Sequence, residues 1–562
     1  MRPQCSILLY STTVTPPSQH RHNNRPLAHS RRKAHSKAVS SPIVAFRLPD
    51  NITDNSVATI LFDAYHLLLR EDMMYRLLAV VAFTCLSTLT TLAANKPNVL
   101  VIITDEHNFR TLGCYRDQMS REQGEMWGKD VVVKTPNMDR LATEGVICTR
   151  AYATAPVCTP CRAAMITGRY PHNTGAPTNN LKLRDDIPTL AKLMNKAGYR
   201  SSFVGKWHLG GAGKPEWAPK IDGGFQHKQS MFNRGHWKKF QMTDDGPRIG
   251  ARDKKDTPSY GVDDADEKTF STDFLTDRAI EFITEPSDKP FLTVISYPDP
   301  HGPNTVRAPY DHMFDDLRFA APRTYGREDA AKPDWLAGGA KNHAKFRGEQ
   351  MSKYFGMVKC LDDNLGRILE TLEQQNKLNS TIILFTSDHG DLCYEHDRVN
   401  KGNPYEGSAR VPMLIRYPAR LNSGVVYGDP MGTVDVTPTL LSMAGVDGSK
   451  DFEGRDLSEK LKTSTTKPTE DVTFLRNAGT APTWLAAVDQ RYKLILSVKG
   501  PPWLFDAETD PDELLNFFGR PGTQEITQRL SRQLLQYSLR TNDPFAKNPN
   551  IAKSIKQCLN AK

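Results

Sequence analysis

The sequence predicts an α/β fold, with a large, mostly parallel sheet followed by a smaller C-terminal unit. Nearly continuous apolar, β-branched runs are typical of strands that are buried on both faces of a parallel sheet. Stretches with apolar residues at helical spacing lie between these runs. The chain has 562 residues. This length favours one large domain with a smaller second one.

The first 94 residues differ in character from the rest. Residues 1–73 include a long polar and basic stretch. They are expected to be a disordered leader, or a stretch that is included only because the start codon was wrongly assigned. Residues 74–94 have a short basic start, an apolar run and small residues up to Ala94, which is the pattern of a secretory signal peptide. The apolar run is too short for a comfortable membrane span, and an internal anchor helix is the alternative. We therefore expect a secreted or periplasmic protein without a stable membrane span.

The composition is that of an ordinary globular protein. Apolar residues make up 38% and charged residues 24% of the chain. The formal net charge is +9, and about half of this excess lies in the first 94 residues. The remaining excess is too weak to favour a nucleic-acid partner. The 9 cysteines are too few for a disulfide scaffold, although export would permit one or two bridges.

The first predicted strand ends in two acids. Residues 98–104 form an almost wholly apolar run, followed directly by Asp105 and Glu106. Ligands bind at the carboxyl ends of strands in open α/β sheets, and adjacent carboxylates suit a hard cation. A solvated pair of loop acids is the alternative interpretation.

A distinctive stretch follows at residues 158–162, Cys-Thr-Pro-Cys-Arg. Residues 162–169 can begin a helix, which would place Cys158 near a helix N-terminus. Free N–H groups and the helix dipole favour anions there. Cys158 is therefore a candidate nucleophile at an anion site. A buried structural cysteine is the alternative.

Three further strand ends carry polar side chains. Residues 199–204 lead to Lys206 and His208, which would share one face if the strand continued. Residues 291–296 lead to His301. After an amphipathic helix at residues 351–374, a third run ends in the residues Asp388 and His389. These two mirror the acids after the first strand, so the two strands side by side would assemble one divalent-ion site.

The last hundred residues have a different character. A composition shift near residues 455–470 predicts a boundary between a large domain at 95–460, which carries the candidate site residues, and a C-terminal α+β subdomain at 461–562. The subdomain has short apolar strands at residues 485–488 and 492–496, and a helix that continues through Tyr537.

Together these motifs resemble the type I, formylglycine-dependent sulfatases of the alkaline phosphatase superfamily. Cys-x-Pro-Cys-Arg followed by Thr-Gly-Arg is similar to the family's cysteine signature, and the five motifs occur in the family's order across residues 97–520. The resemblance implies a mixed sheet flanked by helices on both faces, with a small antiparallel C-terminal sheet. Glu106 departs from the family pattern, because a second aspartate is usual there. Metal ligation is therefore better supported at Asp105.

The resemblance also implies two cofactors. A formylglycine-generating maturation enzyme would oxidise Cys158 to 3-oxoalanine, which is formylglycine. A divalent cation, Ca²⁺ by the family pattern, would complete the site, and ligand type alone also admits Mg²⁺ or Mn²⁺. The predicted metal ligands are Asp105, Glu106, Cys158, Asp388 and His389.

Roles for the surrounding groups follow from the same resemblance. The hydrated aldehyde at position 158 would attack sulfur from the metal, and Asp388 would accept its proton. Arg162 and Lys206 would hold this group in place. Lys206 and Lys401 would neutralise the sulfate oxygens.

Two histidines would complete the reaction. His301, together with Lys401, would protonate the leaving alcohol, and His208 would accept the proton whose removal expels sulfate. The products would be an alcohol and inorganic sulfate. The predicted catalytic residues are Cys158, Arg162, Lys206, His208, His301 and Lys401.

The substrate is predicted only by class. Residues 211–260 are rich in loops, aromatic residues and cations. They are interpreted either as lining for a sulfated polysaccharide or oligosaccharide, or as an insertion with its own small core. Two alternatives to a sulfatase are a phosphodiesterase or phosphonate monoester hydrolase of the same superfamily, and a non-catalytic binder of sulfated glycans.

Overall fold

The structure is a computed structural model that describes residues 96–328, 332–336, 344–465 and 467–560. The predicted leader at residues 1–73 and the predicted signal peptide at residues 74–94 lie outside the described residues. None of the described helices is long and apolar enough to cross a membrane.

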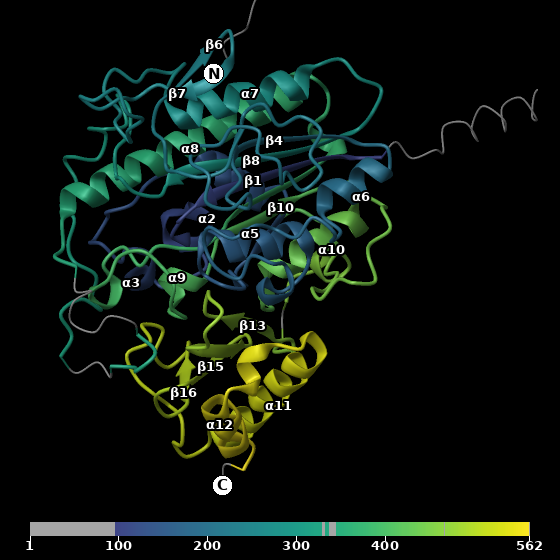
Figure 1. The fold of residues 1–562 in the computed structure, drawn as a ribbon. Coiled ribbons are helices and arrows are strands. Elements are labelled where there is room, and N and C mark those ends of the chain that lie inside the picture. The colour runs from purple at the N-terminus through teal and green to yellow at the C-terminus, as the bar shows by residue number, and fades with distance from the viewer. Residues whose placement is uncertain (1–95, 329–331, 337–343, 466, 561–562) are drawn as a thin grey trace, which may run out of the picture. The chain divides into compact units, whose positions relative to one another are not determined.

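An eight-stranded sheet lies at the centre of the fold (Figure 1), with the strands in the order β11-β2-β10-β9-β1-β8-β4-β5. Neighbouring strands are parallel, except that β10 runs antiparallel to both β2 and β9. The predicted mostly parallel mixed sheet is therefore confirmed. The strands are β1 (Asn98–Asp105), β2 (Val146–Cys148), β4 (Arg200–Lys206), β5 (Met231–Phe232), β8 (Phe291–Pro300), β9 (Thr381–Ser387), β10 (Met413–Arg416) and β11 (Val425–Tyr427).

Helices cover both faces of this sheet. Val99, Val101 and Ile103 of β1 belong to a hydrophobic core shared with α5, α6 and α10. Leu100 and Ile102 belong to a second core shared with α4, α7 and α8. Because successive side chains of a strand point to opposite faces, an apolar run without alternation is buried on both sides. The helices are α4 (Pro136–Thr143), α5 (Cys158–Thr167), α6 (Leu190–Lys196), α7 (Ser271–Thr284), α8 (Gly348–Gln374) and α10 (Val436–Met443).

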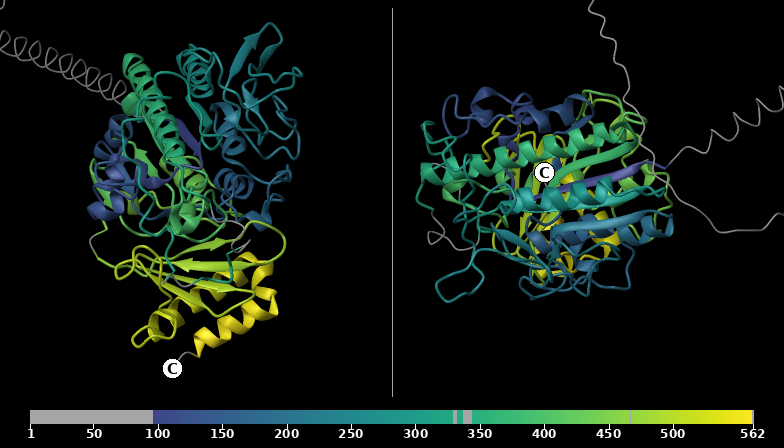
Figure 2. Two further views of the ribbon diagram at one scale, coloured as in Figure 1. Left: turned by 90° about the vertical axis from the view of Figure 1, so that its left-hand side faces the viewer. Right: turned by 90° about the horizontal axis from the view of Figure 1, so that it is seen from above.

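A second sheet near the C-terminus has four antiparallel strands in the order β13-β14-β15-β16. Leu485 and Leu494 pack against its helices, and Trp484 and Ile495 on the other face share a core with Tyr405. Figure 2 shows these helices in yellow beside the yellow-green strands. The predicted small antiparallel sheet is confirmed. Its elements are β13 (Thr473–Arg476), β14 (Trp484–Val488), β15 (Tyr492–Ser497), β16 (Trp503–Asp506), α11 (Gln524–Thr541) and α12 (Pro549–Leu559).

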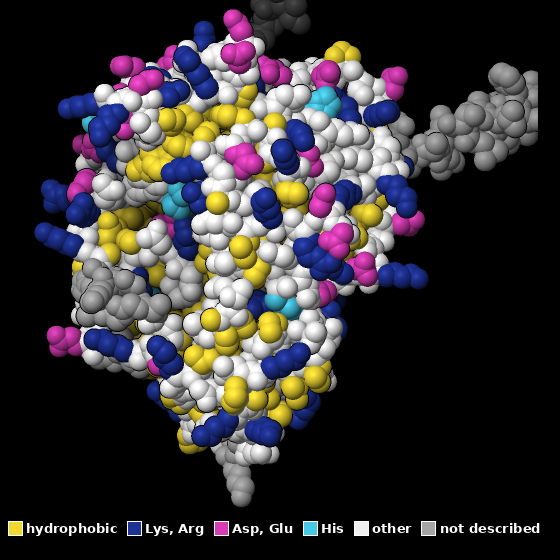
Figure 3. All heavy atoms as spheres, in the orientation of Figure 1, with side chains coloured by type: hydrophobic (Ala, Val, Ile, Leu, Met, Phe, Trp, Pro, Cys, Tyr) yellow, Lys and Arg dark blue, Asp and Glu magenta, His cyan; other side chains and the backbone are white. Residues whose placement is uncertain are grey.

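Several short elements lie outside the two larger sheets. They are α2 (Gly113–Arg116), α3 (Arg121–Gly124), β3 (Ala151–Tyr152), β6 (Phe240–Thr243), β7 (Gly246–Ile249), α9 (Glu406–Ala409) and β12 (Met431–Gly432). The seven cysteines of the described residues are all buried free thiols, so none of the permitted bridges forms among them. On the face drawn in Figure 3, Lys and Arg side chains are scattered among Asp and Glu side chains and form no continuous patch.

The sheet order explains how distant motifs meet. β9, β1, β8 and β4 are consecutive neighbours and run parallel. Their carboxyl ends therefore lie along one edge of the sheet, where ligands bind in α/β folds. Each of these four strands leads into one of the polar motifs identified in the sequence.

Candidate active site

Cys158 is the first residue of α5 and is buried. The helix begins four residues earlier than predicted, but the expected position of the thiol near a helix N-terminus is confirmed. The preceding residue, Val157, offers no side-chain cap. The N–H of Thr159 donates instead to Oδ1 of Asn179 at 3.0 Å. The dipole of the first turn of α5 still adds positive potential at the thiol.

Four potential metal ligands converge in front of this helix. The ligand atoms of Asp105, Cys158, Asp388 and His389 all lie within 4.8 Å of one another, and all four residues are buried. The thiol sulfur lies 3.2 Å from Nε2 of His389 and 3.7 Å from Oδ1 of Asp105.

This donor set fits a divalent cation. Two carboxylates provide hard oxygen ligands, and one imidazole provides a nitrogen. Burial raises the pKa of Asp388, and the nearby charge of Asp105 raises it further, against the opposing effect of Arg162. A bound cation would remove the cost of holding two carboxylates so close together in a buried site.

Arg162 fixes the two carboxylates. Its Nε atom lies 2.8 Å from Oδ2 of Asp388, and a terminal nitrogen lies 3.4 Å from Oδ2 of Asp105. The same guanidinium donates to the carbonyl oxygen of Lys206 at 2.9 Å. A planar fork with five N–H donors in a fixed geometry can hold all three groups at once. Arg162 thus connects the ends of β1, β4 and β9.

Lys206 provides a second buried cation next to the thiol. Its ammonium forms an ion pair with Asp105 and lies 3.9 Å from the sulfur of Cys158. Burial opposes ionisation of the thiol, but the charges of Lys206, Lys401 and His389 outweigh it and hold the pKa of Cys158 well below its usual range. The site is therefore built to stabilise negative charge at position 158.

Glu106 occupies a different position from the other predicted metal ligands. Its carboxylate lies 3.0 Å from Nε2 of His301 and 3.1 Å from Nζ of Lys401, outside the group of four. Nζ of Lys401 and Nε2 of His301 are themselves 2.7 Å apart. Burial would raise the pKa of Glu106, but His301 and Lys401 hold it at about 2. The ionised carboxylate therefore holds the two residues that were predicted to act on the leaving group.

His208 reaches the site by a route that the sequence did not indicate. β4 ends at Lys206, and His208 has a φ of 58°, so the predicted sharing of a strand face is wrong. The hydroxyl of Thr159 donates to the carbonyl oxygen of His208 at 2.8 Å, which ties this turn to α5. Burial lowers the pKa of the imidazole, while the adjacent Cys158 opposes this effect. The ring is therefore held neutral, as a proton acceptor requires.

His236 is a site residue that the sequence analysis did not select. Its Nε2 atom lies 2.7 Å from Nζ of Lys206, and its ring stacks on that of His301. It comes from the loop-rich insertion at residues 211–260. Its only sequence signal was its presence among aromatic and cationic residues, which the insertion's core explains equally well.

The aromatic residues of that insertion are mostly structural. Trp217 packs edge-on against Phe232 and Phe240, with ring centroids 5.6 and 5.5 Å apart. Phe232 and Phe240 are buried in the same core as Phe274 of α7. These residues therefore join the main hydrophobic core beside β1 and α7, so the prediction that the insertion has a separate small core is wrong for them.

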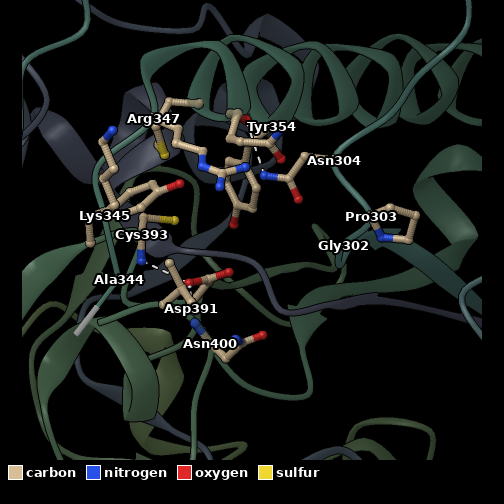
Figure 4. Close-up of a pocket in the computed structure, with 14 residues that line it drawn as sticks. Gly302, Pro303, Asn304, Ala344, Lys345, Arg347, Tyr354, Asp391, Cys393 and Asn400 are labelled. Atoms are coloured by element: carbon tan, nitrogen blue, oxygen red, sulfur yellow. Dashed lines mark hydrogen bonds between the residues drawn. The ribbon is translucent and has the colours of Figure 1, made fainter. Parts of the chain in front are cut away.

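A cavity of about 450 Å³ lies next to the segments that carry His301 and Lys401, and Figure 4 shows it in close-up. Gly302 and Pro303 line it directly after His301, and Val399 and Asn400 line it directly before Lys401. The cavity therefore opens on the side of the site where Glu106, His301 and Lys401 meet.

The chain is similar to known proteins over most of its length. The sequence model of the sulfatase family matches residues 97–446, and that of the C-terminal region of N-sulphoglucosamine sulphohydrolase matches residues 394–540. An ulvan-active sulfatase of Formosa agariphila is 28% identical and covers 80% of this chain and 82% of its own length. An N-acetylglucosamine-6-O-sulfatase of Bacteroides thetaiotaomicron is 25% identical and covers 83% of this chain and 90% of its own length.

A solved structure of a protein in complex with its substrate D-glucosamine-2-N,6-O-disulfate shares the fold. It aligns with a TM-score of 0.63 at 23% identity, over 80% of this chain and 99% of the other.

Proposed function

Because the chain belongs to the sulfatase family, we propose that it hydrolyses the sulfate ester of a carbohydrate, through a formylglycine formed from Cys158. Water and the ester give an alcohol and inorganic sulfate. The observation that carries this proposal is the position of Cys158, which lies at a helix N-terminus beside three metal-ligand side chains and Lys206. Two relatives are named an ulvan-active sulfatase and an N-acetylglucosamine-6-O-sulfatase, and these names support a carbohydrate substrate.

Asp105, Asp388 and His389 would hold the divalent cation, for which Ca²⁺ is the first candidate. When bound, the cation supplies positive charge next to position 158, where the reaction concentrates negative charge. A formylglycine there would supply, in its hydrated form, a hydroxyl group that can attack sulfur and an aldehyde that can be re-formed. Glu106 is proposed to act through His301 and Lys401, because its carboxylate lies on them.

The chain's own cations would bind the sulfate group. Lys206 and Lys401 would face the sulfuryl oxygens, and Arg162 would keep Asp388 and Asp105 in position. The activation barrier to hydrolysis of a sulfate ester must fall by on the order of 20 kcal/mol. Preorganised charges in a buried site are the largest source of such stabilisation.

Two imidazoles would move protons. His301, held by Glu106 and beside Lys401, would donate a proton to the oxygen of the leaving alcohol. His208, buried near Cys158 and held neutral, would accept the proton whose removal releases sulfate. The two residues follow neighbouring parallel strands, β8 and β4, so both can reach the same sulfate group.

Maturation and location complete the proposal. Residues 74–94 would direct export, and a formylglycine-generating enzyme would be a transient partner that acts on residues 158–162.

The function is tested with the purified protein from a host that forms formylglycine. We expect release of sulfate from 4-nitrophenyl sulfate and from sulfated oligosaccharides, and no such release by Cys158→Ala. Turnover of bis(4-nitrophenyl) phosphate in clear preference to every sulfate ester would identify a phosphodiesterase instead. Sulfate release by Cys158→Ala at the native rate would contradict the assigned nucleophile.

A further inference from the structure

The cavity beside His301 and Lys401 lies where a leaving alcohol would depart. Gly302 and Asn400 line this cavity. They are the sequence neighbours of His301 and Lys401, the two residues that are proposed to act on the leaving group. The part of the substrate that remains attached to the alcohol oxygen must therefore occupy this cavity or its mouth. A volume of about 450 Å³ lies in the range of pockets that bind small ligands.

Two cations line the cavity, Lys345 and Arg347, and both are exposed. Arg347 is the one whose planar fork can pair with an anion in a bidentate manner. It precedes α8 and points into the cavity in Figure 4, towards the side on which Asp391 lies. Within the part of the chain that the structure describes, its guanidinium has no hydrogen bond or ion pair. Two nearby groups are already engaged: Asn304 donates to the carbonyl oxygen of Gln350 at 3.1 Å, and Asp391 accepts from the backbone N–H groups of Cys393 and Asn400, both at 2.8 Å. The guanidinium thus keeps its donors for a ligand, and the ammonium of Lys345 adds a second positive charge to the lining.

The lining has the chemistry of a site for an anionic sugar. Amide side chains of Asn304, Gln350 and Asn400 offer donors and acceptors that match hydroxyl groups. A guanidinium presents a planar fork that matches a carboxylate or a sulfate in a bidentate manner. The N-terminus of the 27-residue helix α8 adds positive potential on the same side.

We propose that this cavity binds a sugar unit through a second anionic group, a carboxylate or a sulfate, that pairs with Arg347. The inference rests on the proposed function and narrows the class of substrate that it names. The substrate would be a glycan that carries an anionic group in addition to the sulfate that is removed. Arg347 would set specificity, because only a substrate with that group gains the charge-assisted pairing with the guanidinium.

The test compares substrates and variants. The substrates are 4-nitrophenyl sulfate, a monosulfated neutral disaccharide, a disulfated disaccharide and a monosulfated disaccharide with a uronate. Relative to 4-nitrophenyl sulfate, Arg347→Ala should lower kcat/KM about 10- to 100-fold more for a doubly anionic disaccharide, mainly through KM. The disulfated and uronate substrates distinguish a sulfate from a carboxylate as the second group. Arg248→Ala, an exposed arginine of the β6–β7 hairpin, is the matched control.

A binding measurement separates this inference from the proposed function. Calorimetry with Cys158→Ala should detect binding of the doubly anionic disaccharide, and the double variant with Arg347→Ala should bind it at least 10-fold more weakly. An equal effect of Arg347→Ala on all four substrates, or unchanged affinity in calorimetry, would overturn the inference. If the native enzyme releases no sulfate from any ester, the proposed function fails, whatever calorimetry shows.

Discussion

The imidazole rings of His236 and His301 are stacked, with their centroids 3.4 Å apart and their planes inclined by 10°. The two histidines come from different parts of the chain, since His301 follows β8 and His236 belongs to the insertion between β4 and α7. His236 also lies 2.7 Å from Nζ of Lys206. One side chain of the insertion therefore contacts both a proposed sulfate-binding cation and the proposed proton donor.

This relationship predicts that His236 is a positioning residue. His236→Phe keeps a ring for stacking but removes the acceptor for Lys206, so kcat should fall about 10-fold or more for every sulfate ester. His236→Ala also releases His301, so it should cause a larger loss for esters with poor leaving groups, which depend most on protonation. The measurement is kcat for 4-nitrophenyl sulfate and for a sulfated sugar.

His227→Ala is the matched control, because His227 is an exposed histidine of the same insertion that contacts Phe282. Equal losses for both substrates and both His236 variants would contradict a role in positioning His301.

Glu106→Gln tests whether Glu106 acts through its ion pairs. The variant loses the charge that holds His301 and Lys401, so kcat should fall about 10- to 100-fold. The bound metal, measured by elemental analysis, should stay at the native level. Asp388→Asn, by contrast, should lose most of the metal. Loss of metal from Glu106→Gln to the same extent would show that Glu106 is a metal ligand after all.

Metal binding should also be visible in thermal stability. A ligand at 100 times its Kd adds about 2.7 kcal/mol to the free energy of unfolding. Adding Ca²⁺ to chelator-treated protein should therefore raise Tm by several degrees, and the rise should vanish in Asp388→Asn. Asp451→Asn is the control, because the Asp451 carboxylate is exposed. An equal rise of Tm in Asp388→Asn would contradict the assigned metal site.

The sequence predicted the parts of this site that follow directly from strand ends. Asp105 and Asp388 each follow an apolar run, and Lys206 ends a shorter predicted strand of mixed polarity. Parallel neighbours bring such ends together. His208 was identified for the wrong geometric reason, because its backbone turns into the left-handed region after β4 ends. Local periodicity cannot reveal a turn of that kind.

His236 and Arg347 could not be predicted from local patterns, because their positions depend on tertiary contacts. His236 reaches Lys206 only because the insertion packs its aromatic residues into the core beside α7. Arg347 points into the cavity only because α8 begins opposite the loop that carries Asp391. The partners of Glu106 likewise come from loops about 200 and 300 residues away in the chain.

A buried charge cluster between the main sheet and the C-terminal sheet predicts a pH dependence of stability. Nζ of Lys493 lies 2.6 Å from Oε1 of Glu406 and 2.7 Å from Oε1 of Glu513. Burial raises the pKa of Glu513 to about 7, and the charge of Glu406 adds to this against the effect of Lys493. Between pH 4.5 and about 7 the folded state therefore holds more protons than the unfolded chain, so stability should fall as pH rises through this window.

Glu513→Gln should flatten this fall, measured as the free energy of unfolding in denaturant at several pH values. The loss of this slope should amount to on the order of 3 kcal/mol between pH 4.5 and about 7. Glu508→Gln, at a side chain that is 65% exposed, is the control and should keep the native slope. An unchanged slope in Glu513→Gln would refute the assigned pKa.

The central claim is that the working group at position 158 is no longer a cysteine. Mass spectrometry of the tryptic peptide of residues 151–162 tests it most directly, and Cys161 in the same peptide is the internal control. After treatment with an alkylating reagent, the active enzyme should show alkylation at Cys161 and an aldehyde, reactive towards a hydrazide, at position 158. Fully active enzyme in which both thiols are intact and alkylated would contradict the account.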